Sequence, residues 1–219
     1  MPNQIQVGLQ NVGDNTSPIN QRGDNYGATV VQESGGWYQE MVRRGYGFIY
    51  SQAAAGVALA VPGSGAKTSF MIWNPTGSGR LIVPLKITMG LVSTSAVLGN
   101  ISIYYGTGLG ANIGTGAPVV SYTSATPVNA LIGSSVTSVM AFAPGVENLT
   151  TAPTYLKTLG WSILANDLSA KTTWNFETDL QGSLIFAPGN AMIIGPSTAV
   201  ASVCVISCFG VEVPIPVGM

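Results

Sequence analysis

Hydrophobic and polar residues alternate along much of the chain after Tyr46. Apolar side chains take every second position from residue 81 to 89, and a second alternating run covers 203–213. A period of two is typical of a strand with one buried face. Shorter apolar runs cover 57–61, 70–73, 101–105, 136–142, 184–187 and 191–194. The pattern therefore predicts about eight short strands.

Glycine and proline separate these runs. Turn signals of this kind stand at 62–63, 74–79, 143–145 and 187–189. Pro84 lies inside the first alternating run and cannot donate a ladder hydrogen bond, so that strand is expected at an edge or a bulge. The stretch from 106 to 130 is rich in Gly, Ala, Thr and Pro and is expected to form a long loop with weak strands. We predict an all-β fold, a single antiparallel β-sandwich that is jelly-roll-like.

The beginning of the chain has a different character. Residues 1–34 are polar with scattered glycine and proline, which predicts an extended arm that has no core of its own. The segment from Trp37 to Arg44 is predicted to be a short helix, and the glycine that follows it is a natural stop. The expected organisation is an N-terminal arm with a short helix, 1–45, and a β-sandwich domain, 46–219.

Charge is scarce in this sequence. Only 8 % of the 219 residues are charged, against roughly 25 % in an ordinary soluble domain, and the net charge is -1. Near-neutral surfaces favour association over repulsion. We therefore favour a subunit of an obligate assembly, while a monomeric β protein rich in Ser and Thr stays open as an alternative.

The composition excludes several functions. Because the chain has no histidine, neither a histidine-based catalytic triad nor a histidine-liganded zinc site can form. Eight Lys and Arg against nine Asp and Glu do not make a nucleic-acid-binding surface. The longest apolar stretch, 199–211, is shorter than the roughly 18 residues that a membrane span needs. No cofactor or metal is expected, and the absence of a signal-peptide pattern indicates synthesis in a host cytoplasm.

Two cysteines lie four residues apart in the last alternating run. On a strand, the Cα atoms of Cys204 and Cys208 would be about 13 Å apart, too far for a disulfide bond between them. We interpret them as small buried hydrophobic residues in a reducing compartment. A bridge between two molecules is the alternative.

Few residues carry candidate chemistry. Glu177 and Asp179 face the same side of a predicted strand, at a spacing that does not forbid glycoside hydrolysis, and Trp174 could stack on a sugar. The alternatives are a solvated strand face or a pair that meets Lys171 or a neighbouring subunit. The tripeptide 22–24, Arg-Gly-Asp, matches an integrin-binding motif that a glycine-rich segment produces easily by chance. We expect no enzymatic activity.

The predicted helix offers the best candidates for contact residues. Arg43 and Arg44 form the one adjacent basic pair, which could meet carboxylates of another subunit or form a solvated face. Trp37 could be a buried anchor at an interface, although packing in a core is the default for tryptophan. We therefore propose Trp37, Arg43 and Arg44 as residues that contact another subunit.

Two turn motifs carry a family resemblance. The run 70–81, Phe-Met-Ile-Trp-Asn-Pro-Thr-Gly-Ser-Gly-Arg-Leu, resembles the apolar-Asn-Pro-x-Gly-Ser-Gly turn of small β-sandwich virion proteins of tailed bacteriophages. The order Phe-Ala-Pro-Gly at 186–189, an apolar strand, and Glu-Val-Pro-Ile at 212–215 is also similar. In that family the proteins decorate or cement the capsid, or attach to the tail, usually as trimers. The resemblance implies a structural role in the virion and supplies no catalytic residues.

The sequence thus suggests a phage virion structural protein of the capsid decoration or cement type. We expect it to bind and stabilise the shell as an oligomer, a homotrimer by the resemblance. Its partners would be further copies of itself and the major capsid protein or other virion proteins. A host-recognition module of a head or tail fibre, binding a glycan or receptor, is the alternative.

Overall fold

The computed structural model describes residues 37–93, 99–106, 119–149, 151–162, 175–198 and 203–215. The chain divides into two compact units, Met1–Glu40 and Met41–Met219. In the first unit the described part is the beginning of the helix α1 (Trp37–Arg43), which is one residue shorter than the sequence predicts. The second unit contains every strand of the described residues.

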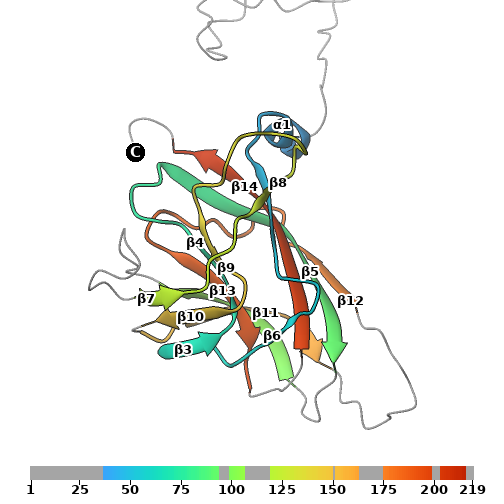
Figure 1. The fold of residues 1–219 in the computed structure, drawn as a ribbon, viewed down its shortest axis with the longest axis vertical. Coiled ribbons are helices and arrows are strands. Elements are labelled where there is room, and N and C mark those ends of the chain that lie inside the picture. The colour runs from blue at the N-terminus through green and yellow to red at the C-terminus, as the bar shows by residue number, and fades with distance from the viewer. Residues whose placement is uncertain are drawn as a thin grey trace, which may run out of the picture. The chain divides into compact units, whose positions relative to one another are not determined.

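The described residues are mostly β-strand, and all pairings between strands are antiparallel, so the prediction of an all-β fold is confirmed. Figure 1 shows the arrangement of these elements and labels most of them. The strands are β1 (Gly47–Ser51), β2 (Val57–Ala58), β3 (Gly65–Thr68), β4 (Phe70–Trp73), β5 (Arg80–Ser93), β6 (Gly99–Gly106), β7 (Val119–Tyr122), β8 (Val128–Asn129), β9 (Ala141–Ala143), β10 (Val146–Leu149), β11 (Thr154–Ser162), β12 (Asn175–Asp179), β13 (Ala191–Pro196) and β14 (Val203–Pro214).

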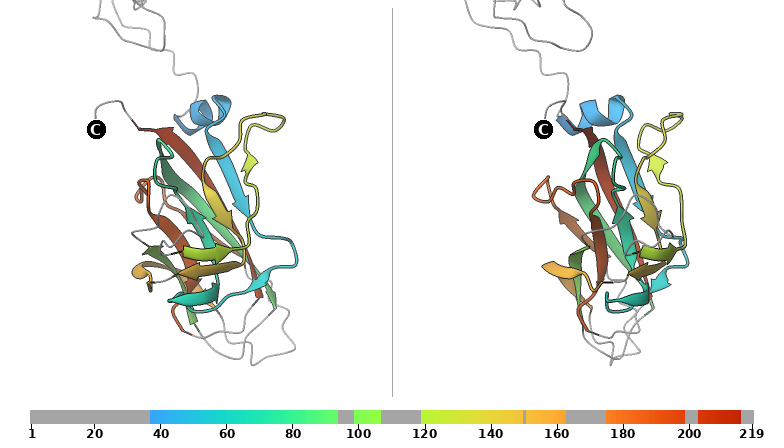
Figure 2. Two further views of the ribbon diagram at one scale, coloured as in Figure 1. Left: turned by 60° about the vertical axis from the view of Figure 1, so that its left-hand side comes forward. Right: turned by 90° about the vertical axis from the view of Figure 1, so that its left-hand side faces the viewer.

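These strands form three sheets. The first sheet has the order β12-β5-β14-β1-β8, with β2 paired to one end of β14. The second sheet has the order β11-β6-β13-β4-β9, and the third is β3-β10-β7. The two longest strands, β5 and β14, run side by side through the first sheet, as Figure 2 shows.

The second sheet is buried on both faces at β4 and β13. In β4, Phe70 and Ile72 belong to the main core, which also contains residues of the first sheet such as Phe48 and Ile87. The alternate β4 residues, including Met71, pack in a second cluster together with side chains from β13 and β10. Strands buried on both sides carry continuous apolar runs, which explains why 70–73 and 191–194 stand out in the sequence without alternating.

Proline occupies a bulge in the long strand β5. Gly210 of β14 pairs with Pro84 and the preceding residue, Phe209, pairs with Lys86, so Leu85 is the extra residue. The strand lies between β12 and β14, but β12 pairs with it only from Lys86 to Gly90, so Pro84 pairs with β14 alone. The bulge and the missing second partner remove the need for a proline N–H.

Three predicted strands are wrong in extent. The run 136–142 becomes a strand only from Ala141, the run 184–187 forms a single bridge between Ile82 and Phe186, and the run 57–61 is a strand only over Val57–Ala58. In the run 136–142, hydrogen bonds to side chains take the place of hydrogen bonds to a neighbouring strand. The N–H groups of Val136 and Met140 donate to serine hydroxyls, and that of Val139 donates to a carboxylate.

Candidate functional site

A tight turn between β4 and β5 positions the arginine that begins β5. The buried Asn74 donates from Nδ2 to the carbonyls of Arg80, at 2.8 Å, and Phe186, at 2.9 Å. The hydroxyl of Ser78 donates to Asn74 Oδ1 at 2.5 Å. Gly77 has a φ of 81°, a conformation that suits glycine. Asn74 therefore connects the two turn motifs of the sequence, 74–79 and 186–189.

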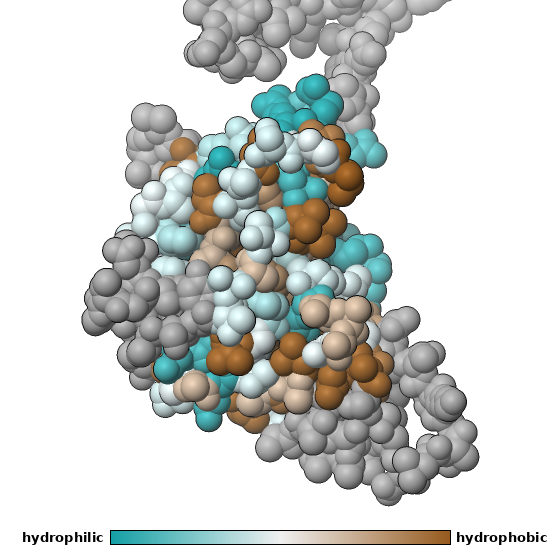
Figure 3. Space-filling model, in the orientation of Figure 1, coloured by the Kyte–Doolittle hydropathy of each residue, from teal (hydrophilic) through white to brown (hydrophobic). Residues whose placement is uncertain are grey.

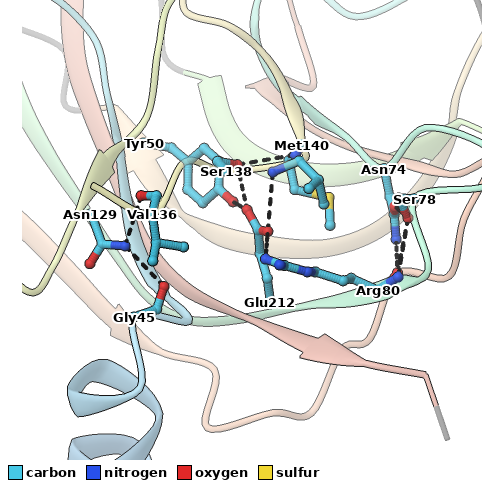
Figure 4. Close-up of polar contacts among 11 residues, drawn as sticks. Gly45, Tyr50, Asn74, Ser78, Arg80, Asn129, Val136, Ser138, Met140 and Glu212 are labelled. Carbon is cyan, nitrogen blue, oxygen red and sulfur yellow. Dashed lines mark hydrogen bonds and ion pairs between the residues drawn. The ribbon is translucent and has the colours of Figure 1, made fainter. Parts of the chain in front are cut away.

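The arginine pairs with a fully buried glutamate, Glu212 of β14. Arg80 Nη1 lies 3.0 Å from Glu212 Oε2, and the backbone N–H of Val139 donates to the same oxygen at 3.2 Å. The other oxygen, Oε1, accepts from the Tyr50 hydroxyl at 3.1 Å and from the Ser138 hydroxyl. Figure 4 shows Arg80, Tyr50 and Ser138 converging on this carboxylate from β5, β1 and the segment before β9.

Both oxygens of the Glu212 carboxylate accept hydrogen bonds. A buried carboxylate is costly unless it is paired and hydrogen-bonded, and both oxygens of Glu212 meet that condition. Burial, and next the negative charge of Glu212, raise the pKa of Tyr50 well above its ordinary value, so this hydroxyl stays protonated and donates. The cluster therefore acts as a clamp that fastens residues 138–139 to β14.

A second clamp holds the other end of the same segment. The side chain of Asn129, in β8, donates to the carbonyls of Gly45, at 2.9 Å, and Val136, at 3.2 Å. Its own oxygen accepts the N–H of Leu131 at 2.9 Å. Residues 128–139, here called the anchored segment, are thus fixed at both ends by buried polar side chains, although only two of them belong to a strand.

The anchored segment presents apolar side chains to solvent. Twelve large hydrophobic residues are exposed among those that the structure describes, and five of them lie in this segment. A sixth, Ile49 of β1, pairs in register with Val128. Figure 3 shows hydrophobic residues on the face along which β8 and the following segment run. We call this set the apolar surface, and its members are Ile49, Val128, Leu131, Ile132, Val136 and Val139.

The structure locates the residues proposed from the sequence without testing their roles. Arg43 ends α1 and Arg44 follows it, and both are exposed. Trp37 begins the helix, and its side chain is not among those described. Their contact with a capsid or a neighbouring subunit stays a prediction. The Arg-Gly-Asp tripeptide lies outside the described residues.

Glu177 and Asp179 lie on one exposed face of β12, as the spacing predicts. Both carboxylates meet Lys86 of the neighbouring strand, at 2.5 Å and 3.8 Å from its Nζ. The hydrogen bond to Glu177 raises the pKa of Lys86 above its ordinary value. The arrangement matches the alternative of a solvated strand face, with Lys86 as the cation, while Lys171 and Trp174 lie outside the described residues.

A second buried carboxyl group lies in the third sheet. Glu147 of β10 is fully buried, and its Oε1 accepts the Ser69 hydroxyl at 2.9 Å while its Oε2 has no hydrogen-bond partner. Burial raises the pKa of Glu147 to about 7, although the Ser69 hydrogen bond and the charge of Lys67 act in the opposite direction. This group is half protonated near neutral pH, so it makes the third sheet sensitive to pH.

The two cysteines are free and buried, which confirms that they form no bridge with each other. Burial raises the pKa of Cys204 to about 11 and that of Cys208 further still, so both remain thiols at neutral pH. They line the main core on the inward face of β14.

That inward face also carries Glu212, which the sequence reading missed. In β14 the even-numbered residues from Cys204 onward point inward, and the period of two places Glu212 among them. The sequence did contain one signal for this buried site, a single glutamate at a position that the period of two places on the inward face. Its partner Arg80 is 132 residues away in the sequence, a separation at which no local spacing can reveal the pair.

The comparisons add no relative. A scan against family models, a search of curated proteins and a search of solved structures each found no match. Within the described part of the chain, no three His, Cys, Asp or Glu side chains gather as metal ligands would. The same part contains no helix long and apolar enough to span a bilayer. Any function assigned to the chain therefore rests on the geometry of the site and on the sequence.

Proposed function

We propose that this chain is a structural subunit of a phage particle, of the type that decorates or cements the capsid. The observation that carries the proposal is the strand order. Among the strands of the two larger sheets, β1 pairs with β14, β4 with β13, β5 with β12, and β6 with β11. Strands near the start of the chain thus pair with strands near its end, and strands further in pair with each other. This is the pairing of one long hairpin that has been rolled up.

This order supports a jelly-roll-like sandwich. Four of the paired strands lie in the first sheet and four in the second, and side chains of both sheets meet in the main core. Eight strands in two facing sheets with this connectivity define a jelly roll, an architecture frequent in viral capsid proteins and lectins. Because a fold hosts many functions, the assignment to a virion also depends on the surface.

The surface favours assembly over catalysis or free solution. The anchored segment exposes apolar side chains, and the whole chain carries a net charge of only -1. In the proposed role, copies associate into an oligomer, a trimer by the family resemblance, and this oligomer attaches to the shell. Several weak contacts per oligomer then add up to firm attachment.

The test is the location of the protein in particles. Lysates of the cells that produce the full chain are separated on a density gradient, and the particle band is quantified by mass spectrometry. The proposal predicts a copy number comparable to that of the major shell protein, and immunogold label spread over the head. A few copies at a fibre tip support the host-recognition alternative, and absence from particles overturns the virion assignment.

A further inference from the structure

We infer that the apolar surface on the anchored segment is the site where a second copy of this chain docks. The inference deepens the proposed function and rests on it, because it names the surface through which the oligomer forms. Ile132 is 80 % exposed and Val128 is 56 % exposed. Single exposed apolar residues are ordinary. Here five lie within twelve residues of sequence and a sixth pairs with one of them, and such a concentration is typical of an interaction surface.

The segment is held in one conformation before any partner arrives. Asn129 fastens its beginning to the carbonyl of Gly45, and Glu212 fastens its end through the N–H of Val139. A segment that is already ordered loses little conformational entropy when it binds, so more of the contact energy appears as affinity. A docking surface that is formed before its partner binds needs a fixed backbone. The buried side chains of Asn129 and Glu212 fix the two ends of the anchored segment in this way.

The distribution of charged residues favours a second copy of this chain as the partner. The sequence contains no Asp, Glu, Lys or Arg between Lys86 and Glu147, a stretch that includes the whole anchored segment. The side chains of the apolar surface therefore supply no counter-charge to an acidic peptide, a nucleic-acid phosphate or a lipid headgroup. The exposed Arg43 and Arg44 lie outside this set, next to Gly45. Against another copy of itself it meets an equally uncharged apolar surface, without like-charge repulsion. Interface cores are depleted of charge in the same way.

The residues around these side chains suit the rim of such an interface. Ser135 and Thr137 are exposed between the apolar positions and can hydrogen-bond water or a partner. A standard interface buries about 800 Å² on each partner, with a small apolar centre and a polar rim. Ile132, as the most exposed member of the apolar surface, is the expected centre.

The experiment compares charge insertions inside and outside the apolar surface. Full-length wild type, Ile132→Asp and Ile185→Asp are run by sedimentation velocity over a range of concentrations. Ile185 is 58 % exposed and lies outside the anchored segment, so it is a matched control. Ile132→Asp should raise the dissociation constant of the oligomer about tenfold or more, whereas Ile185→Asp should leave it unchanged. Urea unfolding of both variants checks that the fold is retained.

A second measurement uses cysteine variants, so that no charge has to be introduced into the apolar surface. In Ile132→Cys and Ile185→Cys, the added thiol is the reactive one, since Cys204 and Cys208 are buried. A maleimide should react slowly with residue 132 in the oligomer and rapidly after dilution, while residue 185 reacts rapidly throughout.

Two outcomes would overturn the inference. One is unchanged self-association of Ile132→Asp together with a fully reactive thiol at position 132. The other is an Ile132→Asp variant that still self-associates but no longer co-sediments with particles, because the surface then binds a different virion protein. Co-sedimentation of the wild type with particles tests the proposed function separately, so the two ideas can fail independently.

Discussion

Replacing Glu212 with leucine should destabilise the protein strongly. The substitution keeps a side chain of similar size but removes the acceptor of four hydrogen bonds. The Tyr50 hydroxyl is left without its acceptor in a buried position, and the Val139 N–H in a partly buried one. An unsatisfied buried donor costs about 1–3 kcal/mol. Arg80 and Ser138 are partly exposed and can turn toward water, so the Tyr50 hydroxyl and the Val139 N–H set the magnitude, about 3 kcal/mol in total.

Urea unfolding followed by tryptophan fluorescence measures this loss at pH 7 and fixed protein concentration. Glu212→Gln is the matched control, because an amide of the same shape still supplies one acceptor oxygen and should lose only about 1–2 kcal/mol. Hydrogen exchange adds a local readout, since the Val139 amide should exchange much faster in the leucine variant than in the wild type.

The essential expectation is that the free energy of unfolding falls from the wild type to Glu212→Gln, and falls again to Glu212→Leu. If Glu212→Leu unfolds within about 1 kcal/mol of the wild type, the carboxylate does not hold the anchored segment and the docking surface is not preformed. Equal losses in the two variants would show that the charge of Glu212 matters and that its shared acceptor oxygens do not.

Three further expectations concern the other polar side chains. Glu147 keeps its proton in the folded state up to a pKa of about 7, against an ordinary value of 4.5. Unfolding free energy should therefore fall by about 3 kcal/mol as pH rises through this window, and Glu147→Gln should remove this fall in pH-dependent urea titrations. Asn129→Ala removes the donor to two carbonyls and the acceptor of one N–H, so it should cost about 2 kcal/mol in thermal unfolding and weaken self-association in sedimentation. Lys86→Met breaks two exposed ion pairs and should leave the urea midpoint unchanged, because exposed pairs contribute little.

The strands that the sequence revealed are those with many buried residues. The alternation in β5 and β14 is visible because apolar residues pack on both faces of these long strands. Ile87 and Met89 lie in the main core, whereas Val83 and Leu85 of β5 pack with Val211 of β14 in a third cluster. β4 and β13 appear as continuous apolar runs because both of their faces are buried. In contrast, β11 and β12 lie at the ends of their sheets and mix polar and apolar residues irregularly, so no hydrophobic period marks them.

The candidate site depended on contacts that sequence spacing cannot show. The run 136–142 has the apolar content of a strand, but Ser138 and Glu212 capture the backbone N–H groups that a ladder would use. The sequence reading placed the contact residues on the helix, at Trp37, Arg43 and Arg44. Their role stays a prediction. The exposed apolar group lies on the anchored segment, and its exposure became visible only when β8 was placed beside β1.

The mass of the full chain in solution tests the account most directly. Sedimentation velocity of the wild type, from dilute to concentrated samples, should give species at multiples of 22.5 kDa, and Ile132→Asp should shift them toward the single chain. A wild type that stays at 22.5 kDa at the highest concentration reached would contradict the claim that this protein works as an assembled subunit.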